Sequence, residues 1–138
     1  MISVLIPVFN QDINTLVAWL SAGFSRLGAA GEIIVMDDAS EPAFQLVNNA
    51  IASLPFVRYS LHAQNQGRIR IRQHLADAAT GDWLLFLDGD SELITDDFLD
   101  KYILAVTAHA GVVVGENLYC CSAQRLCSPF TLDLWPGS

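Results

Sequence analysis

Gly81-Asp82-Trp83-Leu84-Leu85-Phe86-Leu87-Asp88-Gly89-Asp90 is the segment that decides the fold of this chain. Its five apolar residues, 83–87, are typical of a short strand that is buried on both faces of a sheet. Two aspartates, separated by one glycine, follow this strand at once. Side chains two residues apart in an extended chain point to the same side, so we expect the carboxylates of Asp88 and Asp90 about 7 Å apart.

The two carboxylates have two interpretations. At about 7 Å they repel each other by about 2 kcal/mol at an effective dielectric constant of about 20. A divalent cation between them would turn that repulsion into attraction, and carboxylate oxygens suit Mg²⁺ or Mn²⁺ bound together with substrate phosphates. The alternative is a solvated turn, since aspartate and glycine are common turn residues. This segment alone favours neither interpretation.

Length and composition describe one globular domain. The chain has 138 residues, of which 52% are hydrophobic and 16% charged, and a chain of this size buries about two-thirds of its unfolded surface. A net charge of −8 argues against general affinity for nucleic acid or anionic membranes. No run approaches 18 apolar residues, so we expect no membrane span. The cysteines, Cys120, Cys121 and Cys127, lack a pairing framework and metal-ligand spacing, which predicts reduced thiols and a cytoplasmic location.

Predicted strands and helices alternate along the chain. Short aliphatic runs predict strands at 2–6, 33–36, 56–61, 83–87, 112–114 and 118–120. Apolar residues at helical spacing predict helices at 13–27, 42–54, 68–79 and 95–106. Such alternation is typical of a parallel sheet with right-handed crossovers. We therefore predict an α/β fold with three layers, α/β/α, and a mostly parallel sheet.

Three of the predicted strands end in polar residues. These are 7–10 after the first strand, Asp37 and Asp38 after the second, and Asp88 to Asp90 after the strand at 83–87. A doubly wound sheet binds ligands at the carboxyl ends of its strands, so all three clusters are expected at one edge. This convergence favours a metal and phosphate site over a solvated turn.

Positive charge is concentrated near that edge. Arg68, Arg70 and Arg72 fall within five residues, in a chain with 7 lysines and arginines. Arg68 and Arg72 are four apart and share the buried face of the predicted helix, whereas Arg70 is expected to face solvent. Two kinds of partner stay open for the inward arginines: a phosphate or carboxylate ligand, or an internal salt bridge to Asp38 or Asp88.

In order and spacing, these segments resemble the inverting family 2 glycosyltransferases. The similarity covers most of residues 2 to about 120, through Ser3–Asn10, Glu32–Ser40, Asn65-Gln66-Gly67 with Arg72-Gln73, and Thr80–Asp90. It implies the glycosyltransferase-A fold, a Rossmann-like sheet that binds nucleotide-diphosphate sugars. It also implies Mn²⁺ or Mg²⁺ as cofactor, and metal-dependent transfer of a sugar, most often from uridine diphosphate (UDP), to a glycan or lipid acceptor. Such proteins commonly act in cell-surface glycan synthesis, in the cytoplasm or at the inner face of the membrane.

The resemblance also implies roles for single residues. Together with Arg68, which its helix face selects, the expected nucleotide-binding residues are Pro7, Phe9, Asn10, Asp38, Arg72 and Asp88. The expected metal ligands are Asp88 and Asp90, with Asp88 at the ribose or the metal. The family's Ala-Arg-Asn step reads Ile71-Arg72-Gln73 here, which keeps the arginine.

The resemblance leaves the catalytic base unassigned. Family members are usually longer, and their catalytic Asp or Glu lies beyond the region covered here. The downstream candidates are Glu116, Asp133 and His109, of which Glu116 follows a predicted strand. We therefore expect residues 1–138 to be a single nucleotide-sugar-binding domain that ends before the acceptor-binding part. Apolar surface left uncovered at that end predicts self-association.

Two other functions stay open. The first is a binding module with the same pocket and no catalysis. The second is a nucleotidyltransferase of related fold, which would carry a glycine-rich basic loop near the N-terminus. Residues 7–12 contain neither glycine nor a positive charge, which argues against the second function.

Overall fold

The structure is a computed structural model, and it describes residues 1–28, 30–89, 99–100, 103, 113–115 and 118–122, the last two ranges as backbone. The elements are β1 (Ile2–Val8), α1 (Asn14–Leu27), β2 (Gly31–Asp37), α2 (Pro42–Asn48), the 3-10 helix η1 (Asn49–Ser53), β3 (Val57–Leu61), α3 (Arg68–Ala78), β4 (Trp83–Leu87), β5 (Val113–Gly115) and β6 (Leu118–Ser122).

The predicted elements are confirmed wherever the structure describes them, with one change. The helix expected at 42–54 is α-helical only to Asn48 and continues as a 3-10 helix to Ser53. Of the helix expected at 95–106, Leu99, Asp100 and Ile103 are described, and all three are helical. The C-terminal region expected to self-associate, and the thiol groups of the three cysteines, lie outside the described residues and side chains.

The described residues form one sheet of six strands in the order β3-β2-β1-β4-β6-β5. β1 lies between β2 and β4 and is parallel to both, and β3 is parallel to β2. β6 is antiparallel to β4 and to β5. The prediction of a mostly parallel sheet is therefore confirmed.

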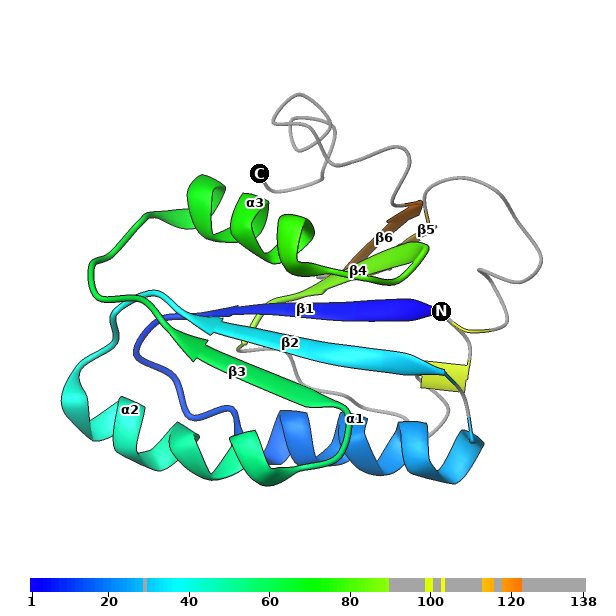
Figure 1. Cartoon of the computed structure of the whole chain (residues 1–138), viewed down its shortest axis with the longest axis horizontal. Helices are drawn as coiled ribbons and strands as arrows, with labels where there is room; N and C mark the ends of the chain where they lie inside the picture. The colour runs from blue at the N-terminus through cyan, green and yellow to red at the C-terminus, as the bar shows by residue number, and fades with distance from the viewer. Residues whose placement is uncertain (29, 90–98, 101–102, 104–112, 116–117, 123–138) are drawn as a thin grey trace.

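Helices cover both faces of the sheet, which gives the three predicted layers. In Figure 1, α1 and α2 lie on one face and α3 on the other. The larger core cluster, which includes Val4, Ile6, Leu85 and Phe24, lies between the sheet and α1. The smaller cluster joins the sheet to α3 through Leu5, Ile34, Leu84, Phe86, Leu75 and Ala76. Because successive strand residues point to opposite faces, a sheet covered on both sides needs the continuous apolar runs seen in β1 and β4.

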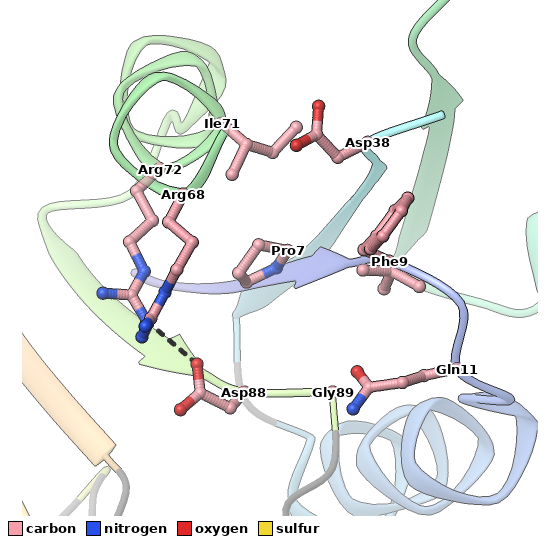
Figure 2. A pocket seen from close by; sticks show the side chains of 10 residues that line it. Pro7, Phe9, Gln11, Asp38, Arg68, Ile71, Arg72, Asp88 and Gly89 are labelled. Atoms are coloured by element: carbon pink, nitrogen blue, oxygen red, sulfur yellow. Dashed lines mark hydrogen bonds and ion pairs between the residues drawn. The ribbon is translucent and has the colours of Figure 1, made fainter. Parts of the chain in front are cut away.

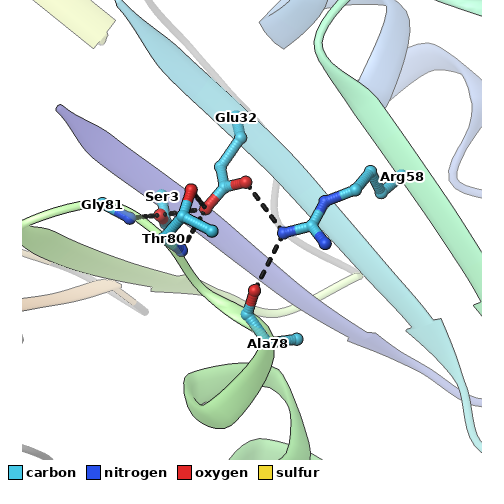
Figure 3. A network of polar contacts seen from close by, with 6 residues as sticks. All are labelled: Ser3, Glu32, Arg58, Ala78, Thr80 and Gly81. Atoms are coloured by element: carbon cyan, nitrogen blue, oxygen red, sulfur yellow. Dashed lines mark hydrogen bonds and ion pairs between the residues drawn. The ribbon is translucent and has the colours of Figure 1, made fainter.

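A polar network fastens the amino ends of β1 and β2 to the turn before β4 (Figure 3). Glu32 Oε1 accepts hydrogen bonds from Ser3 Oγ at 2.6 Å and from the backbone N–H and hydroxyl of Thr80 at 2.6 and 3.0 Å. Glu32 Oε2 pairs with the Arg58 guanidinium at 2.8 Å. This network lies at the opposite end of the strands from the polar strand ends, so we assign it to stability.

Glu32 should make the fold sensitive to acid. Burial raises the pKa of the Glu32 carboxyl, but the hydrogen bonds from Ser3, Thr80 and Arg58 outweigh it and hold the pKa below its ordinary value of 4.5. A lowered folded-state pKa gives stability that is present above the unfolded pKa and lost as pH falls through the folded one. We expect Glu32→Gln to cost about 2 kcal/mol at pH 7 and to flatten the loss of stability below pH 4.5.

Urea unfolding at a series of pH values measures this effect. Asp82→Asn is the control, because the Asp82 carboxylate is 83% exposed and pairs with the N-terminal ammonium. Stability profiles that run parallel for wild type and Glu32→Gln below pH 4.5 would contradict the assignment.

Candidate functional site

The carboxyl ends of β1, β2 and β4 meet the start of α3 around one pocket (Figure 2). The pocket has a volume of about 350 Å³ and is lined by Pro7, Val8, Phe9, Gln11, Asp38, Arg68, Ile71, Arg72, Asp88 and Gly89. It lies where β1 has β2 on one side and β4 on the other, the switch point at which doubly wound sheets bind ligands. The prediction that the three polar strand ends meet at one edge is confirmed.

The loop after β1 presents an aromatic ring and fixes its own backbone to α2. Phe9 lines the pocket with 51% of its surface exposed. Asn10 has a φ of 51°, a left-handed conformation that asparagine tolerates well. Its N–H donates to Ser40 Oγ and its side-chain oxygen accepts from Glu41 N, both at 2.8 Å. Asn10 is not among the residues that line the pocket, so the structure uses its side chain to hold the start of α2.

Asp38 joins the end of β2 to the segment before α3. Its carboxylate is buried, with 5% of the residue exposed. One oxygen accepts from Gln66 N at 2.6 Å and the other from Gly67 N at 3.0 Å. Asn65 Nδ2 donates to the Asp38 carbonyl at 3.0 Å. Asp38 therefore positions the start of α3 while it lines the pocket.

Asp37 has a different environment from its neighbour. It is fully buried and accepts from Ser40 N at 2.7 Å and from the Tyr59 hydroxyl at 3.2 Å. Burial, with the charge and hydrogen bond of Asp37, raises the pKa of Tyr59 to about 12, so the hydroxyl stays a donor at ordinary pH. Asp37 holds the strand ends together and does not line the pocket.

Two arginines extend from the first turns of α3 toward Asp88 (Figure 2). Arg72 Nη2 donates to Asp88 Oδ1 at 3.0 Å, with exposed side-chain fractions of 12% and 38%. The internal salt bridge that the sequence left open is thus formed by Arg72. Arg68 lines the same pocket and has no ion pair or hydrogen bond in the described part of the chain. Arg70 is exposed, as its position on the helix predicted, and Arg68 is exposed as well, although its helix face predicted burial.

Of the two carboxylates that line the pocket, that of Asp88 has an oxygen available for a hard divalent cation. Both oxygens of Asp38 already accept backbone hydrogen bonds. Asp88 uses Oδ1 for Arg72, and Oδ2 has no partner among the residues described. Within those residues no three His, Cys, Asp or Glu side chains gather into a metal site. Asp90 and Glu116, the other predicted metal ligand and the candidate base, lie outside the described residues.

Four residues that line the pocket were not among the predicted site residues: Val8, Gln11, Ile71 and Gly89. Gln11 lies one residue past the polar cluster 7–10, and its side chain reaches Gly89 (Figure 2). Gly89 belongs to the predicted polar cluster after the strand at 83–87, and it lines the pocket itself. The sequence feature that could have identified Gln11 as a pocket residue is its position directly after the polar segment 7–10.

These features define a doubly wound α/β domain with a pocket at its switch point that two arginines and two aspartates line. The chain belongs to glycosyl transferase family 2, because the family model of that description matches residues 3–133.

Curated relatives agree with this assignment. The chain is 32% identical over 141 residues to an N-acetylglucosaminyltransferase of Rhizobium leguminosarum bv. phaseoli, covering 97% of this chain and 32% of the relative. It is 26% identical over 125 residues to an uncharacterized glycosyltransferase of Haemophilus influenzae, covering 87% of this chain and 48% of the relative. The chain thus spans half or less of the length of these two proteins.

Solved structures share the fold. A mannosyltransferase from Pyrobaculum calidifontis, in complex with GDP-Man and Mn²⁺, matches 88% of this chain and 44% of its own, with a TM-score of 0.65 and 12% identity. Glucosyl-3-phosphoglycerate synthase from Mycobacterium tuberculosis, in complex with Mn²⁺, UDP and glucosyl-3-phosphoglycerate, matches 90% of this chain and 57% of its own, with a TM-score of 0.64 and 17% identity. The predicted Rossmann-like fold of the glycosyltransferase-A type is confirmed. Among the described helices, none combines the length and apolar character that a membrane span requires.

Proposed function

We propose that this domain binds a nucleotide-diphosphate sugar, with a UDP sugar as the first candidate, together with Mn²⁺ or Mg²⁺. The observation that carries the proposal is the meeting of Arg68, Arg72 and Asp88 in one pocket at the switch point of the sheet. Cations suit the diphosphate of such a donor, and a carboxylate suits the metal that accompanies it. Two structures of the same fold hold Mn²⁺ with GDP-Man or with UDP, which supports this combination.

The diphosphate would bind at the start of α3. Arg68 and Arg72 line the pocket there, and the amino end of a helix carries partial positive charge. Asp88, and Asp90 two residues on, would hold the metal ion. When bound, that ion acts as a Lewis acid that neutralises charge on the departing diphosphate.

The nucleoside would bind between the loop after β1 and Asp38. The half-exposed ring of Phe9 offers an apolar face, and stacking of a base on an aromatic ring contributes about 1–3 kcal/mol. Pro7 lines the pocket as well, and Figure 2 shows it between Arg68 and Phe9. Asp38 would contact the base through lone pairs that its two backbone hydrogen bonds leave available.

Sugar transfer also needs a base within reach of the acceptor hydroxyl. We propose that residues 1–138 act as the donor-binding domain of a longer glycosyltransferase. The relatives named as N-acetylglucosaminyltransferases, which are longer than this chain, support this proposal. The acceptor would be a glycan or a lipid of the cell surface. Within the chain, the candidates for this base are Glu116, Asp133 and His109.

Thermal unfolding with UDP, with and without Mn²⁺, tests the proposal. Ligand at 100 times its dissociation constant adds about 2.7 kcal/mol, which raises the melting temperature of a domain of this size by about 8 °C. We expect this rise only when UDP and Mn²⁺ are both present, and a smaller one with GDP. An unchanged melting temperature with every nucleoside diphosphate would contradict the proposed donor site. An equal rise without Mn²⁺ would contradict the proposed role of the metal in donor binding.

A further inference from the structure

Asn48, the last residue of α2, is a buried amide that holds the loop after β1. None of its surface is exposed. Its Oδ1 accepts from Ile13 N at 3.0 Å, and its Nδ2 donates to Gln11 O at 2.6 Å. One side chain therefore satisfies two backbone groups, two residues apart, in the same loop. A buried backbone group that loses its partner carries the full cost of desolvation, so this arrangement strongly favours one loop conformation.

The two residues that Asn48 holds, Gln11 and Ile13, are also the spatial neighbours of Gly89. A Cβ atom placed on Gly89 would lie 2.5 Å from Gln11 Oε1 and 3.3 Å from Ile13 Cγ2. Gly89 is therefore packed closely against both residues, and Figure 2 shows the Gln11 side chain extended toward it. The backbone of Gly89 joins Asp88 to Asp90, the two carboxylates proposed for the metal.

We infer that Asn48 is a positioning residue for the metal site. It fixes Gln11 and Ile13, these fix the backbone at Gly89, and that backbone sets the direction of the adjoining Asp88 carboxylate. Asn48 itself is not among the residues that line the pocket. Mg²⁺ demands near-ideal octahedral geometry, so a small shift of its ligands lowers affinity. This inference rests on the proposed function and assigns control of the site's geometry to a residue outside the pocket.

Substitution of Asn48 separates positioning from simple stability. Asn48→Leu keeps the volume and removes both hydrogen bonds. Ser21→Ala is the matched control, because Ser21 is also buried, donates to Pro55 O at 2.8 Å, and does not line the pocket. We expect calorimetry below the unfolding transition of every variant to show Mn²⁺-dependent UDP affinity lowered about tenfold or more by Asn48→Leu and unchanged by Ser21→Ala. Wild-type affinity in a folded Asn48→Leu variant would overturn the inference, whereas absence of binding by wild type would overturn the proposed function instead.

A second measurement applies even where Asn48→Leu does not fold. Gly89→Ala pushes its new Cβ against Gln11 Oε1, and Gln11→Ala removes that atom. We expect Gly89→Ala to lower Mn²⁺-dependent UDP affinity about tenfold in the wild-type chain and less than threefold in the Gln11→Ala background, since residues in contact are not additive. Equal factors in the two backgrounds would show that the contact does not position the Asp88 carboxylate, and would overturn the inference.

Discussion

Asp90→Ala is expected to bind UDP with one weak affinity, whether or not Mn²⁺ is present. The proposed site offers Asp88 and Asp90 as protein ligands, and Asp88 already shares one oxygen with Arg72. Loss of an outer-shell partner of a metal ligand costs about 10- to 100-fold in affinity, so loss of a ligand should cost at least about 100-fold in the metal-dependent part. Calorimetric titration of UDP at zero and saturating Mn²⁺ measures both affinities.

Asp82→Ala is the control for this substitution. Asp82 lies just before β4, whereas Asp90 lies three residues after the last residue of β4. The Asp82 carboxylate is 83% exposed. The control should therefore keep the full response to Mn²⁺. A response to Mn²⁺ that survives in Asp90→Ala would place the metal on other ligands and contradict the role given to the Asp88-Gly89-Asp90 segment.

The sequence predicted the fold well because its signals are local. Runs such as 83–87 are apolar at every position, which a strand covered on both faces requires. The spacing of Arg68 and Arg72 placed both on one face of a helix, and both line the pocket. Convergence of three strand ends followed from topology alone, since parallel strands share a carboxyl edge.

Other features depend on contacts between residues far apart in the chain, which the hydrophobic periodicity of the sequence does not predict. Asp37 and Asp38 are adjacent in the chain, yet one holds Tyr59 and Ser40 while the other lines the pocket. The choice of Asp88 over Asp38 as partner of Arg72 depends on the loops that place β4 and β2 around α3. Asn48 looked like an ordinary polar residue late in a helix, because its two partners lie 35 and 37 positions earlier in the chain.

Arg72 and a metal ion would compete for Asp88. The guanidinium lies 3.0 Å from Asp88 Oδ1, and only 12% of the Arg72 side chain is exposed. A diphosphate would offer Arg72 another anion and bring oxygen ligands to the metal. Each ligand would therefore lessen the competition between Arg72 and the metal ion for Asp88. On the proposed function, metal and nucleotide therefore bind cooperatively, and each raises the affinity of the other by the same factor.

Arg72→Gln should move two affinities in opposite directions. Removal of the positive charge that pairs with Asp88 should favour Mn²⁺ binding without nucleotide, by about fivefold after allowance for solvent at the 38% exposed Asp88. Loss of a charged hydrogen bond to the diphosphate should weaken UDP binding with Mn²⁺ by about tenfold or more. Mn²⁺ titration by electron paramagnetic resonance, with and without UDP, measures both. Arg70→Gln, an exposed position on the same helix, is the control and should change neither affinity. A fall in both affinities for Arg72→Gln would mean that Arg72 supports the site without competing for Asp88.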